Sequence, residues 1–303
     1  MGTPEQIDEQ RDARLVEPGW YPDMSNAEYH GSFAVGSSRL KTLCNQTPAH
    51  FHYERTHPKE STPAMALGTA VHAMVLEPDT YKDAVAVLPE GLNMRSSTDR
   101  AVRDQFIAMN AGKTIITLAQ QHAAEYMAES VMKLTDVRIL LSDMIPESSV
   151  FWWYKSKDPD ESPEPFKQML KVRPDALNPA HSIIIDLKTT RDATETSFNR
   201  AIIDHYYHLS AAMYLEGVNQ CSQLLEHTGN FGFTKFLLVC VENTPPYPAA
   251  AYALPESYLD IGRALYRRAM RVLRDARDQD WPGFPDEIRT IEPPSWANRF
   301  HIV

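Results

Sequence analysis

The chain contains 303 residues, of which 43% are hydrophobic, enough to build the core of one large domain or two small ones. Its formal net charge of -10 argues against a protein that coats nucleic acid non-specifically, but it leaves room for a local basic groove. The three cysteines lie far apart without a C-x-x-C pair, so we expect neither a structural zinc site nor an iron–sulfur cluster, and we expect a reducing cytoplasm. Because we find no apolar run of about 18 residues and no signal peptide, we expect no membrane association.

The two ends of the chain differ from its middle. Residues 1–16 are charged and lack periodicity, which predicts a flexible N-terminal tail, and the proline-rich residues 285–303 predict an irregular C-terminal tail. We expect one folded domain over residues 17–284. It opens with short helices: Ser25 and Glu28 have the spacing of a capping box, and residues 37–43 and 48–54 predict two more.

A longer apolar helix is predicted over residues 64–76. Gly68 and His72 stand four residues apart on one face, so another backbone or a substrate could approach the imidazole. The alternative is a core helix with a tucked histidine. Gly112-Lys113-Thr114 looks like the end of a phosphate-binding loop, but Ile107 stands where its first glycine is required, so we do not expect ATP binding. Periodicity over residues 118–141 predicts one long helix.

A β-ribbon follows these helices. Residues 146–154 predict a strand beginning near Glu147, and residues 166–172 predict the returning strand. Glu147 is either a further acidic group of a functional site or a plain carboxylate at a sheet edge. The β-branched run of residues 183–185 predicts another strand, joined to Asp175 by a polar turn. Such a hairpin brings Asp175 and Asp186 to one sheet edge.

The end of this hairpin could bind a metal ion. Since side chains alternate along a strand, Asp186 and Lys188 point the same way and Leu187 turns into the core. Two close carboxylates repel unless a cation neutralises them, and their oxygens suit Mg²⁺. An adjacent ammonium could orient water or stabilise developing negative charge, as phosphodiester hydrolysis requires. The alternative is a hairpin with a solvated acidic rim.

The last third of the chain predicts a helix over residues 195–217, strands over 233–241 and 249–254, and a helix over 257–278. Tyr207, Ser210 and Tyr214 share one side of the first helix. The second carries an arginine stripe that either lines a DNA path or is a solvated face paired with nearby acids. The stripe comprises Arg263, Arg267, Arg271 and Arg274.

Taken together, the ordered motifs resemble those of the RecE-type (exonuclease VIII) family of PD-(D/E)XK nucleases over roughly residues 19–284. The motifs are Tyr29-His30, Ser37-Ser38-Arg39-Leu40, Pro48-Ala49-His50-Phe51, Gly68-x-x-x-His72, Leu76-Glu77-Pro78, Glu147, Arg173-Pro174-Asp175 and Asp186-Leu187-Lys188-Thr189-Thr190. The resemblance implies an α/β fold: a PD-(D/E)XK nuclease-like mixed central β-sheet flanked by helices, with a helical N-terminal portion.

The resemblance also implies roles for individual residues. The metal ligands would be His72, Asp175, Asp186 and the Leu187 carbonyl, and Lys188 would be the catalytic lysine, with Glu147 a further acidic residue of the site. DNA contacts are expected from Arg39, Arg173, Ser210 and Tyr214. The chain departs from the family at one of these positions, because Ser210 stands where a glutamine is usual. The shorter side chain reaches less far toward a DNA end.

The implied activity is Mg²⁺-dependent exodeoxyribonuclease digestion of linear duplex DNA, with Mn²⁺ as a substitute and without ATP. Digestion would run 5′ to 3′ and leave 3′ single strands for a RecT-like annealing partner. The resemblance further implies a ring-shaped homo-oligomer in the cytoplasm of a bacterial or phage-infected cell, acting in recombination and repair. Two alternatives remain: an endonuclease or end-processing nuclease of the same fold, and a non-catalytic DNA-end-binding protein.

Overall fold

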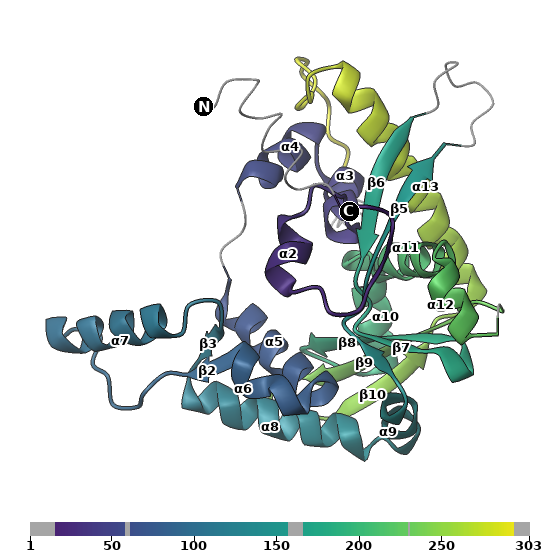
Figure 1. The fold of residues 1–303 in the computed structure, drawn as a ribbon. Coiled ribbons are helices and arrows are strands. Elements are labelled where there is room, and N and C mark those ends of the chain that lie inside the picture. The colour runs from purple at the N-terminus through teal and green to yellow at the C-terminus, as the bar shows by residue number, and fades with distance from the viewer. Residues whose placement is uncertain (1–15, 58–60, 157–165, 230, 294–303) are drawn as a thin grey trace, which may run out of the picture.

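The computed structural model describes residues 16–57, 61–156, 166–229 and 231–293 (Figure 1). Its central sheet has five strands in the order β10-β9-β8-β7-β4. Strands β8 and β9 are parallel and the other neighbours are antiparallel, so the sheet is mixed, as the sequence predicts. The strands are β4 (Ile145–Pro146), β7 (Ala176–Asn178), β8 (Ile183–Thr190), β9 (Lys235–Glu242) and β10 (Ala249–Ala253).

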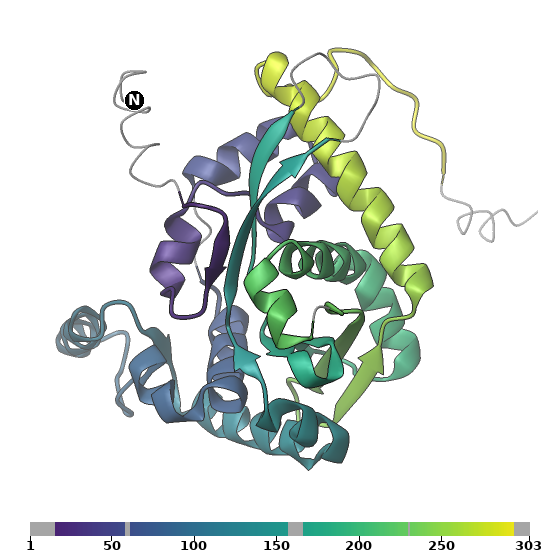
Figure 2. The ribbon, with the colours of Figure 1, turned by 45° about the vertical axis from the view of Figure 1, so that its right-hand side comes forward.

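Helices cover both faces of this sheet, because successive side chains of its central strands enter different cores. Ile184 of β8 packs in a core with residues of α11 (Tyr207–Asn219) and α13 (Glu256–Asp278). Leu187 packs in a second core with residues of α5 (Pro63–Leu76) and α8 (Leu118–Lys133). Figures 1 and 2 show the resulting layers, with α5 and α8 on one side and α11 and α13 on the other.

A second sheet has the order β1-β5-β6, with β1 (Gly19–Tyr21), β5 (Ser149–Lys155) and β6 (Lys167–Val172). The predicted strand over residues 146–154 is therefore wrong: it is two strands, β4 and β5, in different sheets. Between them, Glu147 has φ 43°, and its backbone N–H donates to the Asp175 carbonyl. A left-handed residue of this kind turns the chain sharply, and here it moves the chain from one sheet to the next.

The N-terminal portion is helical, as predicted, with α2 (Asn26–Gly31), α3 (Ser37–Asn45) and α4 (Pro48–Thr56). The capping box of Ser25 and Glu28 is present at the start of α2. Two cations of β6 and the following loop hold α2 against the second sheet. Lys171 Nζ donates to the Tyr29 carbonyl, and both Lys171 and Arg173 lie over the Tyr29 ring.

Two helices predicted as continuous are each broken. The one expected over residues 118–141 is α8 followed by α9 (Thr135–Ser142), separated by the extended residue Leu134. The break lets the Leu140 carbonyl accept a hydrogen bond from the side chain of Asn178, the last residue of β7. The helix expected over residues 195–217 is α10 (Glu195–Asp204) followed by α11, because Tyr206 is left-handed at φ 53°.

The remaining elements are shorter or peripheral. They are η1 (Pro78–Thr80), α6 (Tyr81–Ala84), β2 (Val85–Val87), α7 (Ser97–Met109), β3 (Thr114–Ile116), η2 (Pro179–His181) and α12 (Ser222–His227). Helix α7 projects from the body beyond the β2–β3 pair (Figure 1). Residues 285–293 form no helix or strand, whereas the predicted N-terminal tail, up to residue 15, and the final ten residues lie outside the described ranges. No helix in those ranges combines the length and apolar character needed to cross a bilayer.

Candidate metal and active site

The β7–β8 hairpin builds the centre of the site. The two strands pair from Asn178↔Ile183 to Ala176↔Ile185, so a hairpin joins Asp175 to β8 as predicted. Its first strand is residues 176–178, however, whereas the apolar run before Asp175 is β6 of the second sheet. Strand β8 then runs on beyond β7. The backbone N–H of Leu187, which lies past the end of β7, therefore forms no hydrogen bond with that strand. It donates to Oδ2 of Asp175 at 2.6 Å, which fixes this buried carboxylate against the strand.

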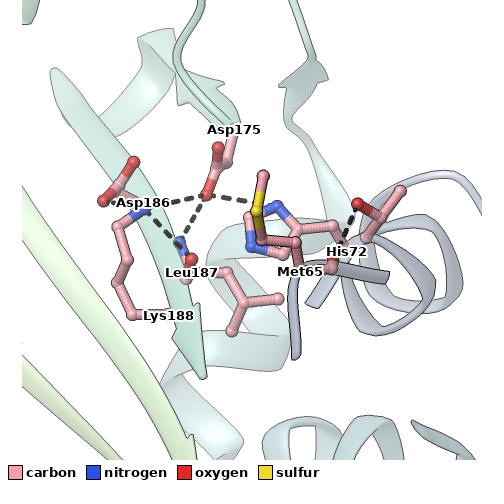
Figure 3. A network of polar contacts seen from close by, with 7 residues as sticks. Met65, His72, Asp175, Asp186, Leu187 and Lys188 are labelled. Atoms are coloured by element: carbon pink, nitrogen blue, oxygen red, sulfur yellow. Dashed lines mark hydrogen bonds and ion pairs between the residues drawn. The ribbon is translucent and has the colours of Figure 1, made fainter. Parts of the chain in front are cut away.

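His72 reaches the same carboxylate from α5. Its Nδ1 lies 3.5 Å from Oδ2 of Asp175 (Figure 3). One turn earlier on α5, a Cβ added at Gly68 would lie 3.7 Å from Oγ1 of Thr189, so this small residue sits beside the end of β8. The alternative interpretation of α5 is a core helix with its histidine tucked inside. The structure instead places the His72 imidazole next to the Asp175 carboxylate.

Asp186 and Lys188 project together from β8, as the alternation predicts, while Leu187 is buried in the core on the opposite face. Lys188 Nζ lies 2.5 Å from Oδ2 of Asp186 and 3.9 Å from Oδ2 of Asp175. Burial opposes the charge of Lys188, but Asp186 and then Asp175 raise its pKa above the ordinary value. Burial raises the pKa of Asp186, and the adjacent Lys188 opposes that rise.

Glu147 enters the site from the junction of the two sheets. Its carboxylate joins His72 and Asp175 in a group whose ligand atoms all lie within 4.8 Å of one another. Burial, followed by the charge of Asp175, raises the pKa of Glu147 to about 8. Of the two sequence alternatives for Glu147, the structure places it among the acids of the site.

The donor atoms fit a hard divalent cation. Carboxylate oxygens dominate, one imidazole nitrogen is available, and Mg²⁺ and Mn²⁺ accept such sets. The Leu187 carbonyl also faces the site, since it accepts a hydrogen bond from Lys188 Nζ at 3.2 Å. Asp186 lies on the far side of the Lys188 ammonium and does not belong to the group formed by the other three side chains. Of the four predicted ligand residues, His72, Asp175 and the Leu187 carbonyl thus lie at the site, whereas Asp186 is held beside it by Lys188; coordination of a metal by any of them stays a prediction.

Helices α3 and α11 form the wall beside Asp186. Ser210 Oγ donates to Ser37 Oγ at 3.2 Å, and both side chains are buried. The pKa of Tyr214 is raised well above its ordinary value by burial and then by the charge of Asp186. Tyr214 is therefore near the acids, and its contact with DNA stays a prediction, whereas the hydroxyl of Ser210 is engaged within the protein.

The two arginines expected to bind DNA occupy different settings. Arg173 is buried and donates to Ser149 Oγ, to Asn26 and to the carbonyls of Met24 and Ser25. These bonds give it a structural role in holding α2, and they do not favour direct contact with DNA. Arg39 is half-buried on α3, with a buried Nη1 that has no hydrogen-bond partner within the described residues. Burial lowers the pKa of Arg39, and nearby Glu54 opposes that shift.

The arginine stripe of α13 is at least partly a solvated face. Arg263 pairs with Glu256 and Asp260, and Arg274 with Asp275. Sequence reasoning missed a different cation, Lys41 of α3, which lies over the Tyr207 ring beside Lys188. Its only sequence signal is its position four residues after Ser37, on the face that α3 turns to α11.

Comparisons with known proteins find a similar fold among solved structures and one matching protein family. A structure provisionally named an exonuclease, from Eubacterium rectale, matches with a TM-score of 0.54 and 15% identity, covering 100% of this chain and 99% of its own. A second structure, of SSO0001, covers 78% of this chain and 84% of its own at 16% identity, but its TM-score of 0.28 is too low to carry an argument. A search of curated proteins gave no match. Residues 36–291 match the family described as "PDDEXK-like domain of unknown function (DUF3799)", and the chain belongs to that family.

Proposed function

We propose that this protein is a divalent-metal-dependent nuclease that degrades linear double-stranded DNA from its ends. The observation that carries the proposal is the convergence of His72, Glu147 and Asp175 at the end of β8, with Lys188 beside them. The PDDEXK-like family supports nuclease chemistry in general. The full chain-length match to a structure provisionally named an exonuclease supports digestion from ends.

The side chains would divide the work of hydrolysis. A bound Mg²⁺ or Mn²⁺ would polarise the scissile phosphate and lower the pKa of a water molecule. Asp175 and His72 would hold the cation in register with β8, because the Leu187 N–H fixes the carboxylate of Asp175. Lys188, held by Asp186, would place its ammonium against the phosphate and stabilise the negative charge that develops there.

Several finer features are proposed on the motif resemblance alone. They are 5′-to-3′ polarity, production of 3′ single strands, handover to a RecT-like annealing protein, and assembly of several copies into a ring. The cytoplasmic location and the role in DNA recombination and repair have the same basis.

The test uses linear duplex DNA labelled at either the 5′ or the 3′ end. We expect degradation with Mg²⁺ or Mn²⁺ and none with EDTA, and we expect Asp186→Ala to abolish it. Asp275→Ala, which removes an exposed acid of α13 that pairs with Arg274, should retain full activity. Undiminished digestion by Asp186→Ala would contradict the assigned site.

Covalently closed circular DNA separates the remaining candidates. An exonuclease leaves the circle intact, whereas cutting of the circle by the wild type but not by Asp186→Ala would indicate an endonuclease at the same site. Calorimetric titration with Mg²⁺ and Mn²⁺ tests the non-catalytic alternative, since the absence of any metal binding would favour a DNA-end-binding protein.

A further inference from the structure

Two ammonium groups share one aromatic ring beside the proposed site. Lys41 Nζ lies 5.3 Å from the centre of the Tyr207 ring, and Lys188 Nζ lies 5.8 Å from the same centre. The two nitrogens are therefore no more than about 11 Å apart, the sum of these distances. They come from α3 and β8, about 150 residues apart in the chain.

The packing of α3 against α11 holds Lys41 in this position. Ser37 meets Ser210 one turn before Lys41 on α3, and Tyr207 stands one turn before Ser210 on α11. The two helices thus run in opposite directions with matched contacts. The left-handed Tyr206 starts α11 at this point and sets where the Tyr207 ring lies.

Lys41 lacks the acidic partner that Lys188 has. Among the described residues, no carboxylate lies within ion-pair distance of Lys41, and its side chain is half-buried. Burial and then the positive charge of Lys188 lower the pKa of Lys41 to about 8, while Asp186 acts in the opposite direction. A half-buried ammonium next to another ammonium is costly, and an anion between or beside them would remove that cost.

The proposed substrate supplies such anions at the right spacing. A DNA strand carries one phosphate charge per ~3.4 Å of helix axis, so neighbouring phosphates can reach groups separated by about 11 Å or less. Lys188 already contacts Asp186 and lies beside Asp175, where the scissile phosphate would sit. Lys41 is displaced from both acids toward α3, where the next phosphate along the strand would lie.

Resting on the proposed nuclease function, we propose that Lys41 binds the DNA phosphate adjacent to the one being hydrolysed, and so sets the position of the strand relative to Lys188. Lys41 is then a substrate-binding residue of the site, and the ring of Tyr207 is the neighbour that it shares with Lys188.

The experiment measures binding of end-labelled duplexes by fluorescence anisotropy in Ca²⁺, with a gel to show that the DNA stays intact. In one series, a single neutral methylphosphonate replaces a phosphate at successive positions from the end. We expect Lys41→Met to weaken binding roughly tenfold and to lower the salt slope of binding by about 1. One methylphosphonate position should weaken wild-type binding and leave Lys41→Met binding unchanged. Lys41→Arg should retain the wild-type profile.

Lys133→Met is the matched control, because Lys133 is an exposed lysine of α8 that pairs only with Glu129 among the described residues. Thermal unfolding without DNA should be no lower for Lys41→Met than for the wild type, since the change removes an uncompensated charge. If every methylphosphonate effect persists in Lys41→Met, or if its affinity is unchanged, the phosphate contact is wrong while the nuclease function stands. If the wild type neither binds nor cuts DNA, both proposals fall.

Discussion

Lys188→Met should make the fold depend on a divalent cation. Lys188 is the cation that neutralises two carboxylates in this structure, at 2.5 Å from Asp186 and 3.9 Å from Asp175. The side chains of these acids are only 5% and 12% exposed, so water cannot replace the ammonium effectively. Because both acids raise the pKa of Lys188, its stabilising effect is complete below the ordinary lysine pKa and is lost only above it. The effect is therefore fully present at pH 8.

The expected loss follows from this burial. Removing one partner of a buried ion pair typically costs about 3–5 kcal/mol. Unfolding entropy is about 2.1 cal/mol/K per residue, so this loss lowers the Tm by roughly 5–8 °C for a chain of this length. A cation at 100 times its Kd restores about 2.7 kcal/mol. Mg²⁺ should thus raise the Tm of Lys188→Met by several degrees, and by more than it raises that of the wild type, in which the ammonium competes for the same acids.

Differential scanning calorimetry at pH 8, in EDTA and in excess Mg²⁺, measures both effects. Lys188→Arg, which keeps the charge, should lose much less in EDTA. Adding Asp186→Asn to Lys188→Met should recover most of the stability, because the uncompensated carboxylate is then gone. If Lys188→Met unfolds in EDTA within about 1 °C of the wild type, the ammonium does not neutralise these acids, and the reasoning fails.

Three further predictions concern other parts of the fold. The pKa of Glu147 is raised to about 8, so folding favours its neutral form. The stability that this form contributes is fully present below the unfolded pKa near 4.3 and is lost as the pH rises through about 8. The Tm in EDTA should therefore fall between these two pH values, and it should fall less in Glu147→Gln. Arg173→Met should destabilise by ~3 kcal/mol and speed amide exchange in α2, whose preceding carbonyls it binds, while exchange in α8 stays unchanged. Gly262→Ala should lower the free energy of unfolding, measured by urea denaturation, by ~3 kcal/mol or more, since the new Cβ would lie 2.0 Å from the His208 carbonyl oxygen. Gly31→Ala is the control, because a Cβ there meets no atom within 4 Å and should change the free energy of unfolding little.

Local patterns in the chain were enough to predict much of the architecture. The alternation of polar and apolar residues in β8 determined which way Asp186, Leu187 and Lys188 face, because side chains of a strand alternate whatever surrounds them. The turn before Ile183 predicted the hairpin, and the helical spacing around His72 predicted α5. Such features depend on neighbours only a few residues away, and they sufficed for a mixed sheet flanked by helices.

Contacts between distant segments decided the rest. The strand predicted around Glu147 breaks where the chain changes sheets, and the helix predicted across Tyr206 breaks where α11 turns to pack on α3. Pro146 precedes the first break, but neither Glu147 nor Tyr206 is a glycine, so the left-handed backbone at both positions is maintained by packing rather than by residue type. Lys41 joins Lys188 for the same reason: their common neighbour, Tyr207, is placed by tertiary structure. The sequence was thus enough to identify the residues of the site. Only the tertiary structure determined their distances and burial, and only it brought the ammonium of Lys41 to the same aromatic ring as Lys188.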